Sequence, residues 1–209
     1  MSLAPSLGDR RSRKIGLLGG SFNPAHRGHV HISNLALKHL DLDEIWWLVS
    51  PQNPLKPVRG MAPLSERLAQ AAAVAQHSHI RVTDIEASFG SRYTADTLAT
   101  LRKRFPATNF VWIMGADNLK QISRWERWTR IFKLAPIAIF ARPAYSLPAL
   151  GSMAARRFAR HRMFPGSARR LAMAPPPAWV FFATRMDPLS ATAIRVQRRR
   201  SVFAPRVRR

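Results

Sequence analysis

The stretch KIGLLGGSFNPAHRGH, residues 14–29, contains the pattern that most clearly indicates the fold class. Its first half is a short apolar run that ends in two glycines, which is typical of a buried strand. Its second half holds a proline, two histidines and Gly28, and Gly28 opens a helical pattern over 28–40. A buried strand that passes through a glycine-rich turn into a helix is the usual first unit of a parallel α/β sheet.

The rest of the chain repeats this alternation of strands and helices. Pro63 or Ser65 is positioned to start the second helix, and Thr94 is the expected N-cap of the third. Residues 142–178 predict an irregular loop-and-helix region. Six strands with helices between them favour one mostly parallel α/β sheet, which binds ligands at the carboxyl ends of its strands. The strands follow the first at 44–50, 80–86, 109–115, 136–141 and 179–184, and the helices cover 28–40, 65–77, 93–105 and 190–200.

Length and composition set the class of protein. With 209 residues we expect a single domain over 13–209, preceded by a flexible segment at 1–12. The chain has no cysteine, so disulfides, thiolate metal sites and a cysteine nucleophile are excluded. No apolar run is long enough to cross a bilayer, and the start lacks the apolar stretch of a secretory signal. We therefore expect a cytoplasmic protein that does not bind membranes.

The charge is strongly basic, with 34 Lys and Arg against 11 Asp and Glu. A net charge of +23 attracts anions, whether nucleotides, nucleic acids or anionic lipids. From Arg142 onward, Asp187 is the sole acidic residue. The aromatic residues do not alternate with the arginines as a single-strand stacking surface requires, so we favour a solvated basic surface over a specific nucleic-acid face.

The segment 19–29 allows three interpretations. Glycines at the strand end let a ligand approach the backbone, and the start of the next helix favours an anion, to which His26 and His29 would add two donors. A zinc site is the second interpretation, but no Asp, Glu or Cys lies nearby as a third ligand. The third is a turn with two structurally bonded histidines. Neither a Walker loop nor a dinucleotide fingerprint is present.

Two further segments have a structural and a functional interpretation. In SATAIR, 190–195, two hydroxyls and an arginine could grip phosphate or simply begin a helix. In GADNLKQISRW, 115–125, Asp117 could hold ribose hydroxyls or cap a helix. Trp125 could stack on a ring or pack in the core. Neither segment decides between its interpretations by itself.

Together the segments resemble a known family. GGSFNPAHRGH resembles the G-G-[ST]-F-[DN]-P-x-H-x-G-H motif of the nucleotidylyltransferase superfamily, and LSATAIR, 189–195, resembles its second signature, I-S-[AST]-T-x-I-R. RYTADTL, 92–98, and GADNLKQISRW resemble segments of the bacterial nicotinate-nucleotide adenylyltransferases. The resemblance spans about residues 14–195. It implies a Rossmann-like sheet and a reaction in which ATP and nicotinate mononucleotide give deamido-NAD and pyrophosphate with Mg²⁺.

The resemblance also implies roles for individual residues. His26, His29 and Arg195 would be catalytic, through contact with the phosphates of ATP. No resident metal site is implied. ATP would be bound by the loop, by the segment after 109–115 and by the second signature, and the mononucleotide by a separate set. The ATP set is Gly19, Gly20, Ser21, Phe22, His26, His29, Gly115, Asp117, Ser190, Thr192 and Arg195, and the mononucleotide set is Asn23, Lys56, Thr94 and Trp125.

The chain departs from the family pattern at two places. Asn23 replaces the commoner aspartate, and the 14 residues after Arg195 predict a shortened last helix, which bears on any homo-oligomer contact made there. Sister enzymes that use nicotinamide mononucleotide or pantetheine phosphate remain alternatives. The pantetheine-phosphate branch typically has threonine at the position of His26. A third alternative is an RNA-binding protein that uses the basic surface.

Overall fold

The computed structural model describes residues 12–51, 60–90, 92–141 and 146–183. One parallel sheet runs through these residues in the order β3-β2-β1-β4-β5-β7-β6. Its strands are β1 (Arg13–Gly20), β2 (Glu44–Val49), β3 (Ile80–Thr83), β4 (Thr108–Gly115), β5 (Ile137–Phe140), β6 (Arg162–Met163) and β7 (Trp179–Phe182).

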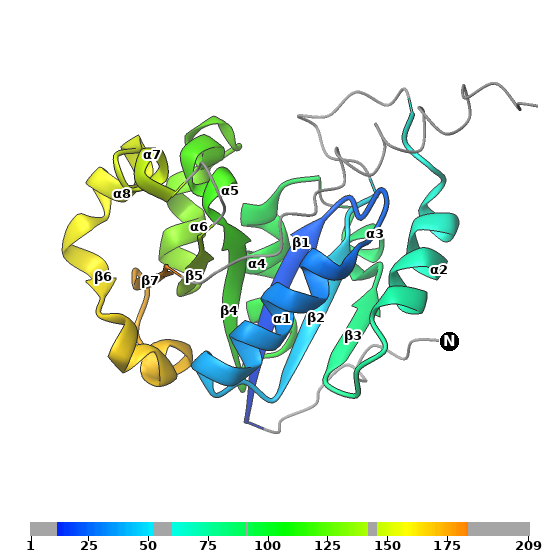
Figure 1. Ribbon diagram of the computed structural model, residues 1–209, viewed down its shortest axis with the longest axis horizontal. Helices are drawn as coiled ribbons and strands as arrows, with labels where there is room; N and C mark the ends of the chain where they lie inside the picture. The colour runs from blue at the N-terminus through cyan, green and yellow to red at the C-terminus, as the bar shows by residue number, and fades with distance from the viewer. Residues whose placement is uncertain (1–11, 52–59, 91, 142–145, 184–209) are drawn as a thin grey trace, which may run out of the picture.

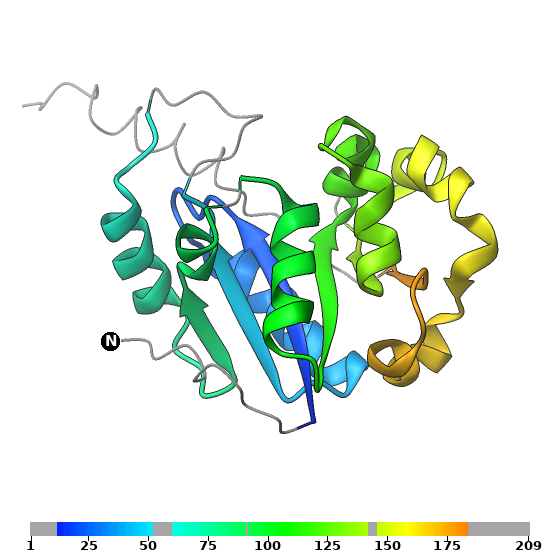
Figure 2. The same ribbon diagram turned by 180° about the vertical axis from the view of Figure 1, so that it is seen from behind.

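Helices cover both faces of the sheet (Figure 1). On the face seen in Figure 1, α1 lies across β1 and β2, and Figure 2 shows α4 on the opposite face. The α-helices are α1 (Arg27–Leu40), α2 (Leu64–Val74), α3 (Ile85–Ser88), α4 (Thr94–Arg104), α5 (Ala116–Gln121), α6 (Trp128–Leu134), α7 (Ser146–Leu150) and α8 (Met153–Arg157). The 3₁₀ segments are η1 (Ile122–Arg124), η2 (Ala159–His161) and η3 (Pro165–Met173).

Two apolar cores follow from the alternation of side chains along the central strands. Leu17 and Trp46 pack with α4, α5 and α6 on one face. Leu18 and Trp47 pack with α1, α2 and η3 on the other. Because successive residues of a strand point to opposite faces, strands buried on both sides are apolar throughout. This explains why the strands were visible in the sequence as short continuous apolar runs.

The strand order changes direction at β1. Successive strands pass from β1 to β2 and β3 on one side, and β4 then pairs with the other side of β1. The loops after β1 and β4 therefore diverge, and the space outside the carboxyl ends of these two strands, here called the crevice, is where sheets of this kind bind ligands. The pairing of Leu18 with Ile113 brings Gly20 level with Gly115. Two of the predicted ATP-binding segments thus lie side by side.

The predicted α/β class and the mostly parallel sheet flanked by helices are confirmed, with corrections in detail. The predicted strand 80–86 is shorter, because β3 ends at Thr83 and residues 85–88 form α3. The N-cap of α4 is Tyr93 and not Thr94, since the Tyr93 carbonyl accepts the first helical hydrogen bonds. The loop-and-helix region contains the short strand β6, which the sequence did not predict. No helix in the described ranges is long and apolar enough to cross a membrane.

Gly19 is required by its neighbour on β4. A Cβ at this position would lie 2.4 Å from Cη2 of the buried Trp112 ring. We expect Gly19→Ala to lower the free energy of unfolding by about 1–3 kcal/mol, the usual cost of overpacking a core. Gly20→Ala is the matched control, because its Cβ would meet Phe22 at an ordinary 3.4 Å. Urea denaturation followed by circular dichroism measures both, and equal losses would contradict this account.

Candidate functional site

The loop from Ser21 to His26 connects the carboxyl end of β1 to the first turn of α1. His26 is the N-cap of α1, and its Nδ1 accepts a hydrogen bond from the Gly28 N–H at 3.1 Å. In return His29 Nδ1 accepts from the His26 N–H at 3.1 Å. The two rings lie with their centroids 3.9 Å apart. A capping box normally uses hydroxyl and carboxyl side chains, and here two imidazoles satisfy the same backbone donors.

These bonds determine where the imidazole protons lie. Each Nδ1 accepts from a backbone N–H, so the neutral rings of His26 and His29 carry their proton on Nε2. Both rings belong to the N-cap and first turn of α1, where the helix dipole favours an anion. Among the residues that the structure describes, no group of three or more His, Cys, Asp or Glu side chains could hold a metal ion. The phosphate interpretation of 19–29 fits this geometry best.

Aromatic side chains pack against one another beneath the backbone of the loop from Ser21 to His26. Phe22 is 2% exposed, has a φ of 46° and stacks on Trp47 with a centroid distance of 5.1 Å. A bulky residue with positive φ is strained and persists only where its surroundings hold it. Trp47 Nε1 donates to Ser33 Oγ, and Ser33 Oγ donates to the His29 carbonyl. The ring beneath the loop is thus tied to the helix that carries His29.

Asn23 links this loop to the start of the next helical unit. Its Nδ2 donates to the Gly60 carbonyl at 2.9 Å, and its Oδ1 accepts from the Ala62 N–H at 3.4 Å. Either Asn or Asp can accept through Oδ1, but the amide of Asn23 can also donate. The structure therefore gives the departure from the family's commoner aspartate a local role. Its predicted contact with the mononucleotide stays a prediction.

Arg67 contacts the loop after β1 and was not predicted from the sequence. It lies on the inner face of α2 and is 1% exposed, and it donates to backbone carbonyls of three separate segments, including Ser21. Burial lowers the pKa of its guanidinium, because desolvation penalises the charged form. The sequence feature that could have indicated its burial is its position one helical turn before Ala71, on the apolar side of an otherwise alanine-rich helix.

Gly115 and Asp117 follow β4 as predicted. Gly115 is the buried last residue of the strand and the N-cap of α5, with Asp117 half-buried in the first turn of that helix. Both lie at the carboxyl edge of the sheet, beside the end of β1. The structure therefore brings these two residues and the loop 19–29 to the same crevice.

Thr94 and Trp125 lie on segments that an ion pair joins. Thr94 is the first residue of α4, and Trp125 follows η1 and packs half-buried against the core. Arg127 Nη2 donates to Asp96 Oδ2 at 2.5 Å, and its guanidinium also lies 5.8 Å from the centroid of the Tyr93 ring. The two predicted ring-binding residues are each two positions from one partner of this pair. Asp96 and Arg127 were not predicted from the sequence.

The half-buried carboxyl of Glu86 links α3 to α4. Thr97 Oγ1 donates to Glu86 Oε1 at 2.8 Å, which ties α3 to α4 just beyond the end of β3. Burial raises the pKa of the Glu86 carboxyl, and the hydrogen bond from Thr97 opposes that rise. This contact holds the segment that leads to Thr94.

The remaining predicted site residues lie outside the described residues. They are Lys56, Ser190, Thr192 and Arg195.

Comparison with known proteins identifies the family. The profile of the cytidylyltransferase-like family matches residues 17–197. A Cereibacter sphaeroides protein named "Probable nicotinate-nucleotide adenylyltransferase" is 55% identical over 181 residues, which cover 87% of this chain and 96% of that protein. The chain belongs to the nicotinate-nucleotide adenylyltransferase family. A Methylorubrum extorquens protein of the same name is 52% identical over 184 residues, or 88% of this chain and all of that one. Members of this family are nucleotidyltransferases, and the resemblance found in the motifs is confirmed.

Solved structures support the fold. The Plasmodium falciparum nicotinic acid mononucleotide adenylyltransferase complexed with NaAD superposes with a TM-score of 0.64 at 16% identity. The match covers 88% of this chain and 83% of that one. At this identity the similarity establishes the Rossmann-like architecture of the adenylyltransferase family and not the residues of the site.

The capping role of His26 can be separated from any chemical role. We expect His26→Ala to lower the free energy of unfolding by about 1 kcal/mol, because the Gly28 N–H loses its acceptor. His26→Asn is the matched variant, since Asn is a good N-cap and should keep stability within about 0.5 kcal/mol of the original. Thermal and urea unfolding of the three proteins measure this. Equal stability of the Ala and Asn variants would exclude the capping role.

Proposed function

We propose that this adenylyltransferase transfers the adenylyl group of ATP to nicotinate mononucleotide, giving deamido-NAD and pyrophosphate, a step of NAD biosynthesis. The observation that carries the proposal is the reciprocal bonding of His26 and His29 at the start of α1, beside the crevice between β1 and β4. It leaves the proton of each neutral ring on Nε2 and holds both rings at a helix N-terminus, a position that favours an anion. Because the chain belongs to the nicotinate-nucleotide adenylyltransferase family, we infer that the anion bound there is the phosphate chain of ATP.

The chemistry needs positioning and neutralisation of charge, not a protein base. A phosphate oxygen of the mononucleotide, already ionised at neutral pH, attacks the α-phosphorus of ATP in line. A new P–O bond joins the two nucleotides, and the bond to pyrophosphate breaks with its electron pair on the leaving oxygen. Donors preorganised around the phosphates stabilise the charge that develops. His26 and His29 supply two such donors, and Arg195, Ser190 and Thr192 grip the same phosphates in this proposal.

The substrates occupy different parts of the crevice in this proposal. Gly115 and Asp117 hold the ATP side, with the carboxylate of Asp117 on ribose hydroxyls. Gly19, Gly20, Ser21 and Phe22 form the loop against its phosphates. The pyridine ring of the mononucleotide lies between the segments of Thr94 and Trp125, and Asn23 and Lys56 lie toward its phosphate. The ion pair between Asp96 and Arg127 supports this placement, because it holds these two segments together.

Mg²⁺ enters as part of the substrate MgATP. This ion prefers phosphate oxygens and water and seldom occupies an all-protein cage. The side chains described at the loop are imidazoles whose neutral rings carry a proton on Nε2, and such N–H groups bind phosphate oxygens and not Mg²⁺. The chemistry of the residues thus fits an ion held by the ATP phosphates.

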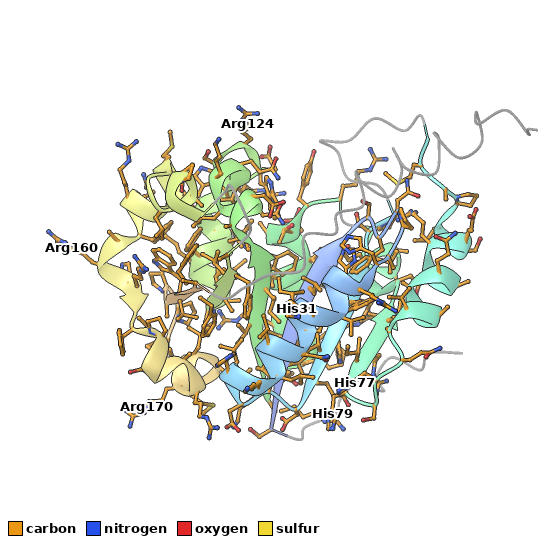
Figure 3. All side chains as sticks on the ribbon, in the orientation of Figure 1. His31, His77, His79, Arg124, Arg160 and Arg170 are labelled. Atoms are coloured by element: carbon orange, nitrogen blue, oxygen red, sulfur yellow. The ribbon has the colours of Figure 1, made fainter. Side chains whose placement is uncertain are left out.

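Nucleic-acid binding is the competing function. Arg124, Arg160 and Arg170 project from separate parts of the surface in Figure 3, which favours a dispersed basic surface over one groove. An RNA-binding protein also has no use for the paired imidazoles at the end of β1. Its affinity for any nucleic acid would fall steeply with salt.

Release of pyrophosphate from MgATP tests the function directly. We expect turnover with nicotinate mononucleotide, and the ratio of kcat/KM for this substrate and for nicotinamide mononucleotide measures the preference for the acid. Pantetheine phosphate is the third substrate to compare. Folded protein that does not turn over nicotinate mononucleotide would refute the proposal.

His29 is expected to contribute to the rate. His29→Ala should lower kcat by at least ~100-fold, the scale for loss of one donor to a developing charge. His77→Ala is the matched control, because His77 is exposed and labelled at the opposite edge of the sheet in Figure 3. Steady-state kinetics of both variants measure kcat. A normal kcat for His29→Ala would leave that ring a structural role only.

Trp125 is expected to bind the pyridine ring. Trp125→Ala should raise KM for nicotinate mononucleotide at least about fivefold, since stacking of a base on an aromatic side chain contributes about 1–3 kcal/mol. Trp125→Phe keeps an aromatic face and should stay close to the original protein. Measuring KM for both substrates checks the placement. An increase confined to ATP would place Trp125 elsewhere.

A further inference from the structure

Arg67 connects the loop after β1 with the loop after β2 and the start of α2. Its Nη1 donates to the Ser21 carbonyl at 2.8 Å and to the Ser50 carbonyl at 2.7 Å. Nη2 donates to the Pro51 carbonyl at 2.9 Å, and Nε donates to the Ala62 carbonyl at 2.9 Å. All three nitrogens of the guanidinium are therefore used, and each bond goes to a backbone carbonyl.

We propose that Arg67 is a positioning residue for adenylyl transfer, which holds the Ser21–Phe22 peptide so that its N–H faces the phosphates of ATP. The inference rests on the proposed function, because it assigns this loop to the phosphates. Arg67 itself is buried and acts through the loop.

The orientation follows from peptide geometry. In a planar trans peptide the N–H points opposite to the carbonyl. The Ser21 carbonyl is directed inward to Arg67, so the Phe22 N–H is directed away from Arg67. Ser21 follows Gly20, the last residue of β1, so this peptide lies at the carboxyl edge of the sheet, where the crevice is. Release of the carbonyl would allow this peptide to rotate and would remove a donor from the crevice.

The strained backbone of Phe22 explains why the contact from Arg67 is needed. Phe22 occupies the left-handed region at φ 46°, which a bulky side chain leaves unless it is held on both sides. Its ring is held by Trp47, and the peptide before it is held by Arg67. The backbone bond from the Ser50 N–H to the Gly20 carbonyl fixes the preceding residue.

The charge of Arg67 adds to the field at this loop. Among the described residues Arg67 forms no ion pair, and its contacts are with neutral carbonyls. A cation without an acidic partner at the base of the loop attracts the phosphates, and the low local dielectric reduces screening. The planar guanidinium also lets Arg67 donate to three segments at once. A lysine could not do so, because its donors all lie on a single nitrogen.

The test compares Arg67→Lys with the original protein. We expect kcat to fall about tenfold or more and the affinity for α,β-methylene-ATP to weaken about tenfold, a loss of about 1.4 kcal/mol. The affinity for nicotinate mononucleotide should change less than about threefold, since its ring is assigned to the separate segments of Thr94 and Trp125. Titration calorimetry gives both affinities without turnover. Arg67→Met, which also removes the charge, should weaken the ATP analogue further.

Arg102→Lys is the matched control. Arg102 is exposed, and its Nη1 also donates to a backbone carbonyl, that of Leu134 at 2.7 Å. It lies near the carboxyl end of α4, away from the loop. This variant should keep kcat and both affinities.

The outcomes separate the two proposals. If the original protein makes no deamido-NAD, the proposed function fails. If the original protein is active and Arg67→Lys keeps its kcat and ATP affinity, the positioning role is overturned. A lower melting temperature with unchanged affinity in the folded protein also overturns it, because that is the signature of a purely structural tie.

A second measurement does not require a variant that folds. In ¹⁵N-labelled original protein, pyrophosphate should shift the Phe22 amide resonance and slow its hydrogen exchange, because the N–H becomes a phosphate donor. The amide resonance of Leu134, whose carbonyl accepts from the control residue Arg102, should not shift. A Phe22 amide that does not respond to saturating pyrophosphate overturns the proposal.

Discussion

The pairing of β1 with β2 on one side and with β4 on the other is the constraint on which the rest of the structure depends. It places the carboxyl end of β1 where the loops of neighbouring strands diverge, and such a crevice is where parallel sheets bind ligands. Gly19 leaves room for the Trp112 ring of β4, which occupies the space that a Cβ would need. The histidines, Gly115 and Asp117 reach one place because their strands are neighbours.

The loop that leaves β1 has a fixed shape before any substrate binds. His26 and His29 satisfy each other's backbone donors, Trp47 supports Phe22 from below, and Arg67 holds the Ser21 carbonyl. A site whose donors are already oriented has little reorganisation to complete when charge develops, which is the physical basis of electrostatic catalysis. The same contacts explain how a bulky residue can remain at a positive φ in this loop.

Most of the fold could be predicted from local patterns, and the errors have local causes. The strands at 109–115 and 136–141 were recognised because residues buried on both faces are continuously apolar. The predicted strand at 80–86 was too long, since Ile85 and Glu86 look like strand residues but begin a helix where β2 no longer offers partners. β6 has two residues and, within the described part of the chain, pairs with β7 alone, so its existence depends on a strand 16 residues further on.

The sequence by itself determined the family, the parallel α/β class and the loop that carries His26 and His29, because these depend on short motifs and on the period of apolar residues. The contacts that hold that loop became visible from the packing of segments that are distant in the sequence. Arg67 is 46 residues from Ser21 along the chain, and Arg127 is 31 from Asp96. No local pattern marks such partners, since a hydrogen bond between distant segments depends on how β1, α2, α4 and α6 pack around the sheet.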